Sequence, residues 1–394
     1  MSDQAASTTT RVVTVHWVGT GLSTGSGVRA LIERGRRVVL WGRTADRAAS
    51  CARALGVEVA AAKEFSLSEL SAELSPGDVV VSMLPAAQHP DLLLACLSAG
   101  AHFACSSYTS PELAELAEQA REAGLVVLTE AGLDPGIDHL LAHVLLRQAV
   151  SELGTGPATV SLTSYCGGVP AVANDFRYLF SWAPAGVLAA LLSPARYVAS
   201  GAVVEAARPW QAVGPLRVGE EDFEVYPNRD SVPFIAQYGV PSEWIVETFV
   251  RGTLRLPGWS AAWAPVFVEL EEHGRDCVPE LAADLARRYP MTAADRDRVV
   301  LVVDLQVESA DGRTFSAGKV LDLTGDAGET AMARCVSLPL AVGITRVLEG
   351  ALPAGLSRAG ETAAEAQRWL DDLAAIEPIG ILATDTAKDV VGAP

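Results

Sequence analysis

The first glycine-rich turn of the chain has residue types that could hold a dinucleotide. Gly19, Thr20 and Gly21 stand where an apolar run over residues 11–18 changes into an amphipathic helical pattern. Small residues at such a turn let backbone amides and the helix N-terminus approach a pyrophosphate. Thr24 occupies the place of the third glycine of the usual GxGxxG pattern, so the turn alone is equally typical of an ordinary tight turn.

Arg43 stands at the end of the second apolar run, where an NAD-selecting acidic residue is expected. Gly42 and Thr44 flank it. A guanidinium can hold a 2'-phosphate by charge-assisted hydrogen bonds, whereas an acidic group would accept the ribose 2'-hydroxyl. The turn and Arg43 together favour NADP. The alternative is an ordinary solvated arginine, because Asp46 and Arg47 nearby also carry charges typical of a surface.

Asp134 lies in a short loop, residues 132–136, that closely follows the apolar run 125–128. If that run is a strand of a parallel sheet, Asp134 lies at or near the carboxyl edge, where ligands bind. Its carboxylate could then exchange a proton with a substrate. An Asp-Pro-Gly sequence is also a good plain turn, and without further context that simpler interpretation is preferred.

Tyr108 and Cys166 are further polar candidates. Tyr108 can donate or accept a hydrogen bond, and Cys166 can do so weakly, or as a thiolate if its pKa is lowered. Most lone cysteines are buried apolar residues, so we expect Cys166 to line a site more than to act as acid or base. His139 and His143 stand one helical turn apart, but Leu140 replaces the glutamate of the metalloprotease pattern, and we expect no metal. His139 is expected to hold the Asp134 loop through a hydrogen bond.

The elements that must position these residues alternate between strand and helix over the first 130 residues or so. Apolar runs at 11–18, 38–41, 57–60, 78–84, 103–105 and 125–128 are separated by helical patterns. The alternation predicts an α/β fold: a Rossmann doubly wound parallel sheet. From about residue 158 the pattern approaches strict alternation, and Asp311-Gly312 between two such runs indicates a hairpin.

The second part is therefore expected to be an α+β substrate domain with an antiparallel or mixed sheet. A helical pattern over 331–349 and another over 361–374 are expected to pack back on the first part. We predict an NADP-binding domain of residues 1–140 plus about 332–394, and a substrate-binding domain of about 141–331.

Composition excludes several classes of partner. The 394 residues carry a formal charge of −18, which repels nucleic acid and anionic membrane surfaces. No apolar run approaches the ~20 residues that a membrane helix needs. The six cysteines form no CxxC pair and residues 1–10 are polar, so a reducing cytoplasm fits best. Lysines occur only at Lys63, Lys319 and Lys388, which disfavours Schiff-base catalysis by the protein.

Several sequence blocks, spread over nearly the whole chain, resemble the saccharopine reductase family in order and spacing. The blocks cover residues 80–85 with His89, 106–111, 132–139, 164–171, 180–182, 226–231 and 251–255. The family couples an amino acid to an aldehyde and reduces the imine with NADPH, giving saccharopine from glutamate and 2-aminoadipate semialdehyde, or runs that reaction backward. The resemblance implies the same C–N chemistry here, in the glutamate-forming branch.

The resemblance also implies roles for individual residues. Asp134, Tyr108 and Cys166 are the expected catalytic residues. Arg229 and Arg251 can grip substrate carboxylates in the bidentate way that lysine cannot, although either could form a structural ion pair. Ser181 and Trp182 are expected beside the substrate. The residues expected to bind NADP(H) are Gly19, Thr20, Gly21, Leu22, Ser23, Arg43, Thr44, Leu84, Pro85 and Ser107.

Two rival hypotheses stay open, together with the substrate itself. The segment between Pro170 and Phe180 is shorter than in the family, so the amino donor and the aldehyde are not fixed. A relative acting on polyamines, such as a carboxynorspermidine-type dehydrogenase, would need acidic residues in place of Arg229 and Arg251. A catalytically silent NADP-binding protein would have lost the site groups that are present here. A homodimer is one expected assembly, although no self-complementary pattern stands out.

Overall fold

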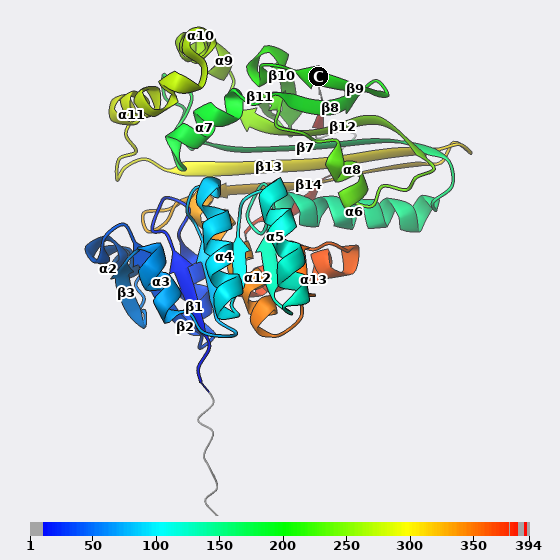
Figure 1. Cartoon of the computed structure of the whole chain (residues 1–394). Helices are drawn as coiled ribbons and strands as arrows, with labels where there is room; N and C mark the ends of the chain where they lie inside the picture. Colours follow the sequence, from blue (N-terminus) through cyan, green and yellow to red (C-terminus); the bar gives the residue numbers. More distant parts are fainter. Residues whose placement is uncertain (1–10, 378, 385–389, 392–394) are drawn as a thin grey trace, which may run out of the picture.

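The structure is a computed structural model that describes residues 11–377, 379–384 and 390–391. A seven-stranded parallel sheet lies in the lower half of the molecule as drawn in Figure 1. The strand order is β15-β6-β5-β4-β1-β2-β3, and each neighbouring pair is parallel. The strands are β1 (Thr14–Val18), β2 (Arg37–Gly42), β3 (Ala61–Glu64), β4 (Val79–Ser82), β5 (His102–Cys105), β6 (Val126–Thr129) and β15 (Gly355–Arg358). Because the order reverses at β1, the strand ends beside β1 open a crevice at the carboxyl edge. The predicted Rossmann sheet is confirmed.

Helices cover both faces of this sheet and so bury its central strands on both sides. All five residues of β1 and all four of β4 are buried. Serine or threonine caps begin several helices: Thr44 and Ser110, for example, each accept a backbone N–H three residues on. The helices are α1 (Ser26–Glu33), α2 (Ala45–Ala54), α3 (Leu67–Glu73), α4 (His89–Ala99), α5 (Pro111–Glu122), α12 (Ala331–Leu348) and α13 (Ala363–Ile376).

The third strand lies later in the chain than predicted. The apolar residues 57–60 are not in a strand, and β3 begins at Ala61. Gly56 adopts a left-handed conformation after α2, and the Val57 amide donates to the Ala52 carbonyl. The closing turn of α2 therefore uses the residues that were expected to pair with β2.

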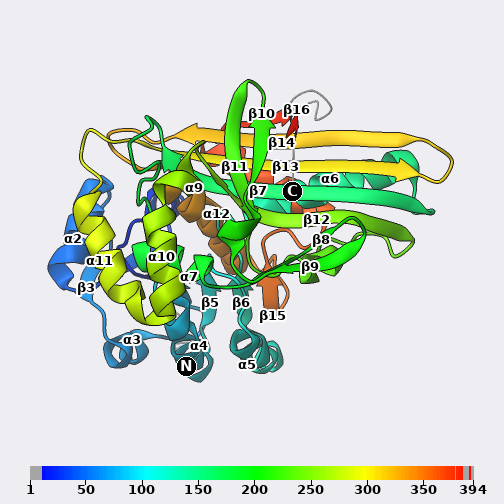
Figure 2. The same ribbon diagram turned by 90° about the horizontal axis from the view of Figure 1, so that it is seen from above.

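A ten-stranded mixed sheet forms the second half, and its long strands β7, β12, β13 and β14 run side by side across the molecule (Figure 2). Among the strands of the described residues only β7 and β12 pair in parallel, so the predicted mixed sheet is confirmed. The strands are β7 (Ala158–Pro170), β8 (Ala195–Ala199), β9 (Ala202–Ala206), β10 (Gly214–Val218), β11 (Glu221–Pro227), β12 (Trp244–Arg255), β13 (Asp297–Ser309), β14 (Thr314–Thr324), β16 (Ile381–Thr384) and β17 (Val390–Val391). Asp311 and Gly312 lie in the β13–β14 hairpin, as predicted.

Helix α6 (Ile137–Leu153) joins the two halves and packs against β13 and β14. The smaller helices of the second half are α7 (Pro184–Leu191), α8 (Pro233–Gln237), α9 (Trp259–Ala262), α10 (Ala264–His273) and α11 (Val278–Arg288). The beginning of α6 places the Asp134 loop between the two sheets, so this junction positions the site.

The end of the chain is divided between the two sheets. Helices α12 and α13 and strand β15 belong to the first half, but β16 pairs with β14 and β17 with β10. We expected residues 332–394 to lie with the first sheet. The pairing of β16 and β17 with the second sheet shows that they do not all do so. The boundaries near residues 140 and 331 stay a prediction.

Helix α12 is the one helix of the described residues that is long and apolar enough to cross a membrane. However, 83% of it is buried within the fold, where it packs against α1, β5, α13 and β13. Gly27 allows the close approach of α1, because a Cβ there would lie 2.0 Å from the Ser337 carbonyl oxygen. The helix has the burial of a core helix.

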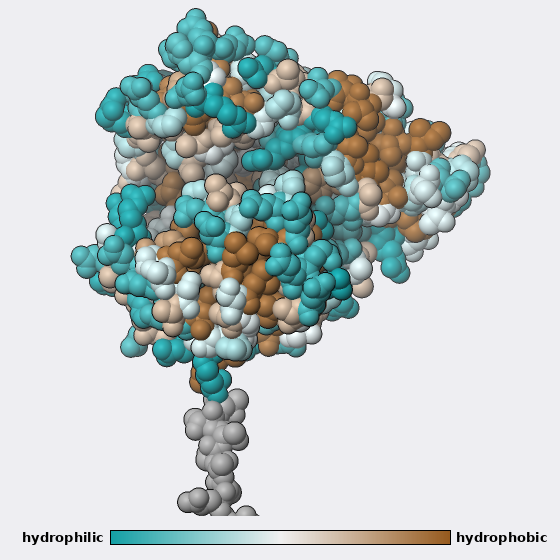
Figure 3. All heavy atoms as spheres, in the orientation of Figure 1, coloured by the Kyte–Doolittle hydropathy of each residue, from teal (hydrophilic) through white to brown (hydrophobic). Residues whose placement is uncertain are grey.

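Apolar residues also gather on part of the surface of the second half, on the side where β8 and β9 lie (Figure 3). Val203 of β9 and Ile245 of β12 are 56% and 67% exposed. Within the described residues β9 pairs only with β8, so its outer edge carries no strand.

Candidate active site

A cavity of about 480 Å³ lies between the carboxyl edge of the first sheet and the second sheet. Residues from the loops after β1, β4, β5 and β6 form one side. Residues of β7, β12 and α12, together with Trp182 and the residues after β11, form the other. The first side includes Ser23, Ala86, Ser106, Ser107, Tyr108, Leu133 and Asp134, and the second includes Cys166, Gly167, Trp182, Asn228, Arg229, Thr253, Arg255, Met332 and Val336. The position matches the ligand crevice expected for an open parallel sheet.

The predicted cofactor turn is fixed by close contacts with the neighbouring strands. Gly19 has φ +116°, and a Cβ there would lie 2.9 Å from Met83 Cβ, so glycine is required. Thr24, in the third glycine position, is buried, and its hydroxyl donates to the Gly19 carbonyl at 3.0 Å and accepts from Trp17 Nε1 at 3.2 Å. Nothing lies within 4 Å of a Cβ built at Gly21, so this part of the turn is open.

The N-terminus of α1 was predicted to approach the pyrophosphate of a cofactor, but its first amides are already occupied. The Ser26 amide donates to the Glu329 carboxylate, and the Gly27 amide donates to the Ser337 hydroxyl at 3.0 Å. Both acceptors come from the α12 region, which seals this helix end. A pyrophosphate would therefore contact the turn itself rather than the helix N-terminus.

The other predicted cofactor residues lie along the same edge. Arg43 is exposed directly after β2, and its side chain forms no hydrogen bond or ion pair within the described part of the chain. Thr44 caps α2, Leu84 and Pro85 follow β4, Ser107 follows β5, and Leu22 and Ser23 complete the turn. An open turn and an arginine without an acidic partner suit the phosphates of a dinucleotide, so these residues fit NADP(H).

Asp134 meets Tyr108 and Arg251 at the inner side of the cavity. Its Oδ1 accepts the Tyr108 hydroxyl at 2.8 Å and Arg251 Nη2 at 2.8 Å. Burial and the neighbouring Asp138 carboxylate raise the pKa of Asp134, and Arg251 and Tyr108 offset only part of that effect. Asp134 is thus a carboxyl that can hold a proton beside the cavity.

Arg251 lies elsewhere than its predicted role requires. It is 2% exposed, is absent from the cavity wall, and forms ion pairs with Asp134 and Asp138. Its guanidinium also lies 3.9 Å from the centroid of the Phe234 ring. Because the carboxylates of Asp134 and Asp138 already bind the Arg251 guanidinium, this arginine is better interpreted as part of a structural ion pair than as a substrate-binding residue.

Arg229 and Arg255 are the arginines that line the cavity. Arg229 is exposed, in a left-handed conformation with φ +57°, and its guanidinium lies 5.0 Å from the centroid of the Tyr108 ring. Arg255 was missed as a site residue by sequence reasoning. It is 4% exposed, its Nε has no hydrogen-bond partner, and no carboxylate pairs with it among the described residues.

Aromatic rings, rather than carboxylates, surround the Arg255 guanidinium among the described residues. Its guanidinium lies 5.0 Å from the Tyr178 ring and 5.6 Å from the Tyr226 and Trp259 rings. Nη1 donates to the Leu254 carbonyl at 2.9 Å. A buried cation without an anionic partner is costly, so its place at the cavity indicates an anionic ligand.

Cys166 lines the cavity, and burial together with the charges of Asp134 and Asp138 raises the pKa of its thiol well above the usual value. The neutral thiol is at most a weak hydrogen-bond donor. Trp182 also lines the cavity, and its Nε1 donates to the Tyr178 hydroxyl at 3.2 Å. Ser181 is fully buried and absent from the wall, so no contact with a ligand follows for it.

His139 was predicted to hold the Asp134 loop through a hydrogen bond, but its side chain bonds to other residues. Its Nε2 lies 3.1 Å from Glu130 Oε2 and its Nδ1 lies 2.8 Å from the Tyr238 hydroxyl. His143 packs edge-on against the Tyr238 ring. No group of three or more His, Cys, Asp or Glu residues that could hold a metal occurs in the described ranges.

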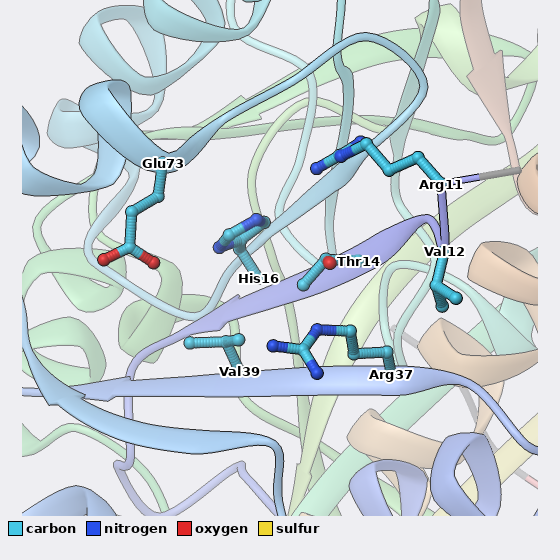
Figure 4. Close-up of a pocket in the computed structure, with 7 residues that line it drawn as sticks. All are labelled: Arg11, Val12, Thr14, His16, Arg37, Val39 and Glu73. Atoms are coloured by element: carbon cyan, nitrogen blue, oxygen red, sulfur yellow. The ribbon is translucent and has the colours of Figure 1, made fainter. Parts of the chain in front are cut away.

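A second hollow, of about 520 Å³, lies at the opposite edge of the first sheet (Figure 4). Thr14 and His16 rise into it from β1, and Arg37 and Val39 from β2. One of the charged side chains that line it, Arg11, is already paired, since its Nη2 lies 2.7 Å from Asp78 Oδ2. Because ligands of such sheets bind at the carboxyl edge, the cavity beside Asp134 is the candidate site.

Comparisons with known proteins point to one family. Residues 15–128 match the model of the saccharopine dehydrogenase NADP binding domain, and residues 132–376 match that of the saccharopine dehydrogenase C-terminal domain. These matches confirm the resemblance and the predicted NADP-binding half.

Three similar proteins illustrate the relationship. Alpha-aminoadipic semialdehyde synthase of Bos taurus is 40% identical over 224 residues, which cover 55% of this chain and 23% of the relative. The chain thus spans about a quarter of the length of that relative. Saccharopine dehydrogenase [NADP(+), L-glutamate-forming] of Pyricularia oryzae is 27% identical over 86% of this chain and 91% of the relative. The apo saccharopine dehydrogenase (L-Glu forming) structure from Saccharomyces cerevisiae has a TM-score of 0.78 at 24% identity, covering 96% of this chain and all of that one, and supports the fold.

Proposed function

Because the chain belongs to the saccharopine dehydrogenase family, we propose that it reduces an imine formed from an amino acid and an aldehyde, with NADPH as reductant, or catalyses the reverse oxidation. The substrate class is an opine: a secondary amine that carries several carboxylates. Saccharopine is the first member of this class to test, since relatives of similar sequence carry its name.

The observation that carries this proposal is the composition of the cavity. Its wall joins the cofactor side, at Ser23 and Ser107, to the proton-holding Asp134 and to the cations Arg229 and Arg255. A reduction of C=N to CH–NH needs a hydride, a proton for the nitrogen and a fixed orientation of the substrate. These three requirements correspond to three parts of one wall.

The arginines are proposed to bind and orient the substrate. Arg255 is buried on aromatic rings and would hold one carboxylate with its unpartnered Nε and the neighbouring nitrogens. Arg229, at the exposed side, would hold another, and Asn228 beside it offers an amide. The apolar wall made by Trp182 and Met332 would contact the aliphatic stem of the substrate.

Asp134 is proposed to carry the proton. In the reductive direction the protonated carboxyl gives its proton to the substrate nitrogen, and in the oxidative direction the carboxylate removes it. Tyr108 donates to Asp134 Oδ1 and so orients the carboxyl toward the cavity. Cys166, neutral and buried, would close the wall and exclude water rather than transfer protons.

The turn at Gly19, Thr20, Gly21, Leu22 and Ser23 is proposed to hold the pyrophosphate of NADP(H), and Arg43 with Thr44 the 2'-phosphate. Leu84, Pro85 and Ser107 would line the path toward the cavity. NADPH, when bound, supplies the hydride. Arg43 would select the phosphorylated cofactor by charge.

The test is an oxidation screen with the purified chain. Saccharopine, other opines and polyamine conjugates are each supplied with NADP or NAD, and the absorbance of the reduced nicotinamide is followed. We expect turnover with NADP and a carboxylate-bearing opine. Turnover only with polyamine conjugates, or with none of these substrates, would contradict the proposal.

Cellular location and assembly are also proposed. We infer a cytoplasmic enzyme that acts on small molecules rather than on membranes or nucleic acids, in line with its charge of −18. We further propose a homodimer, for which the free edge of β9 and the exposed Val203 offer a contact surface. Light scattering of Val203→Glu against the parent chain tests this assembly, and a parent that is monomeric contradicts it.

A further inference from the structure

A row of buried polar side chains runs behind Asp134, and the proposed reaction does not use it. His139, in the first turn of α6, is fully buried. One ring nitrogen faces the Glu130 carboxylate at 3.1 Å, and the other faces both the Tyr238 hydroxyl at 2.8 Å and Asp138 Oδ2 at 3.4 Å. The row therefore ends on Asp138, the second carboxylate that binds Arg251.

Glu130 anchors the far end of the row. It has φ +54°, a left-handed conformation that is strained for a glutamate. Its Oε1 accepts the Thr109 amide at 3.1 Å and hydroxyl at 2.9 Å, and its Oε2 accepts Gln237 Nε2 at 3.0 Å. Burial would raise the pKa of Glu130, but His139, Arg358 and Gln237 together hold it well below the usual range. Glu130 is thus a fixed anion against His139.

Asp138 is held far more tightly than Asp134. Its Oδ1 accepts the Gly136 amide at 2.7 Å, and its Oδ2 accepts both Nε and Nη2 of Arg251. Asp134 receives only one nitrogen of Arg251 and the Tyr108 hydroxyl. Burial opposes ionisation at both carboxyls, yet His139 and Arg251 lower the pKa of Asp138, whereas the pKa of Asp134 is raised.

We propose that His139, gripped by Glu130, is a positioning residue that fixes Asp138 as the permanent partner of Arg251 and so leaves Asp134 as the carboxyl that exchanges a proton with the cavity. The assignment of a reaction to Asp134 rests on the proposed function. The distribution of charge within the row does not, since it follows from contacts inside the protein.

The alternative location of the proton is Asp138, because two carboxyls that share one arginine cannot both be fully compensated. The ionisable and charged groups that face this pair from the surrounding elements are Tyr108, His139, His143, Cys166, Tyr238 and Arg251, and Arg229 faces Tyr108. Of these, His139 Nδ1 and the Tyr238 hydroxyl both lie 3.4 Å from Asp138 Oδ2, and neither contacts Asp134. His139 is the one of the two that can carry a positive charge, so it is the group that distinguishes the two carboxyls by charge.

The test measures both carboxyls directly, in the full chain without substrate. Aspartate labelled at the side-chain carboxyl is followed by NMR over pH, with Asp134→Asn and Asp138→Asn assigning the signals. In the parent chain we expect Asp134 to titrate above the ordinary aspartate range and Asp138 below it. In His139→Asn the Asp138 midpoint should rise by about 1 pH unit or more.

The matched control is His143→Asn, which removes another buried imidazole from the same helix and the same Tyr238 ring. It should leave both midpoints unchanged. An Asp138 midpoint that stays low in folded His139→Asn would overturn the proposal, as would an equal rise in the control. If His139→Asn does not fold, His139→Gln places a longer neutral side chain at the same position, and an unchanged Asp138 midpoint there counts equally against the proposal.

Because these readouts need no turnover, they separate the two conclusions. A chain that oxidises no opine but shows the expected midpoints refutes the proposed function alone. A chain that oxidises saccharopine with Asp138 as the raised carboxyl refutes this inference alone.

Discussion

Asp134 and Arg251 are joined by a hydrogen bond of 2.8 Å at the inner side of the cavity, with side-chain exposures of 12% and 3%. Only the carboxyl borders the cavity. The arginine thus acts through Asp134. It is Arg255, two residues beyond Thr253 on the same face of β12, that lines the cavity with an unpartnered Nε.

Removing the proton carrier should reduce turnover and leave cofactor binding intact. We expect Asp134→Asn to lower kcat by roughly 10²- to 10⁴-fold, the usual contribution of a positioned general acid or base. Fluorescence titration with NADPH should be normal, because Asp134 is not among the residues proposed to hold the phosphates of the cofactor. Unimpaired turnover would leave Asp134 with a turn-forming role only.

The raised pKa of Asp134 predicts opposite pH dependence in the two directions. Oxidation needs the carboxylate, so kcat/KM should fall as the pH drops through this pKa. Reduction needs the protonated form, so kcat/KM should fall as the pH rises through it. In Asp138→Asn the repelling charge is lost, and both limbs should move to lower pH. Profiles of the parent and variant that coincide would contradict this account.

Arg255 should control substrate affinity. Arg255→Met keeps an unbranched side chain but removes the guanidinium and its charge, and we expect kcat/KM for the opine to fall about 10- to 100-fold, mainly through KM. Arg217→Met, which removes an exposed arginine paired with Asp222, is the control. Equal kinetics of the two variants would remove Arg255 from the substrate site.

Arg43 should select the cofactor. Arg43→Asp is expected to raise KM for NADPH far more than KM for NADH, because the 2'-phosphate loses its cation and meets a like charge. Arg47→Asp, on the neighbouring exposed turn of α2, should change neither preference. If both cofactors respond equally to Arg43→Asp, the 2'-phosphate lies elsewhere.

Two glycines near the cofactor turn should respond differently to alanine. A Cβ at Gly27 would lie 2.0 Å from the Ser337 carbonyl oxygen, whereas a Cβ at Gly21 meets nothing within 4 Å. Gly27→Ala should destabilise the protein by about 1–3 kcal/mol, as overpacking does. Gly21→Ala should retain the parent Tm. Thermal unfolding compares them directly, and equal Tm values would refute the close α1–α12 packing.

The first sheet was predictable because its strands are short apolar runs between amphipathic helices, and that signal is local. The hairpin at Asp311-Gly312 is also local. The start of β3 was misplaced because the end of α2, closed at Gly56, takes up residues of the apolar run. The pairing of β16 with β14 depends on a distant strand and has no local signal.

The site residues show the same limit. Arg251 and Arg255 are both arginines on the same face of β12, and the sequence alone does not show which of them forms an ion pair within the protein. The structure shows that Arg251 does, because it pairs with Asp138, which lies 113 residues away in the chain. Likewise the sealing of α1 depends on Glu329, 303 residues from Ser26. Sequence blocks could place the candidates in one site, but only the fold assigns their partners.

The most direct measurement is a crystal structure of the chain with NADPH and saccharopine bound. The account predicts one substrate carboxylate on Arg255, the secondary amine within hydrogen-bond distance of Asp134, and Arg251 still paired with Asp138. A bound substrate that leaves Arg255 without a carboxylate and its nitrogen out of reach of Asp134 would contradict it.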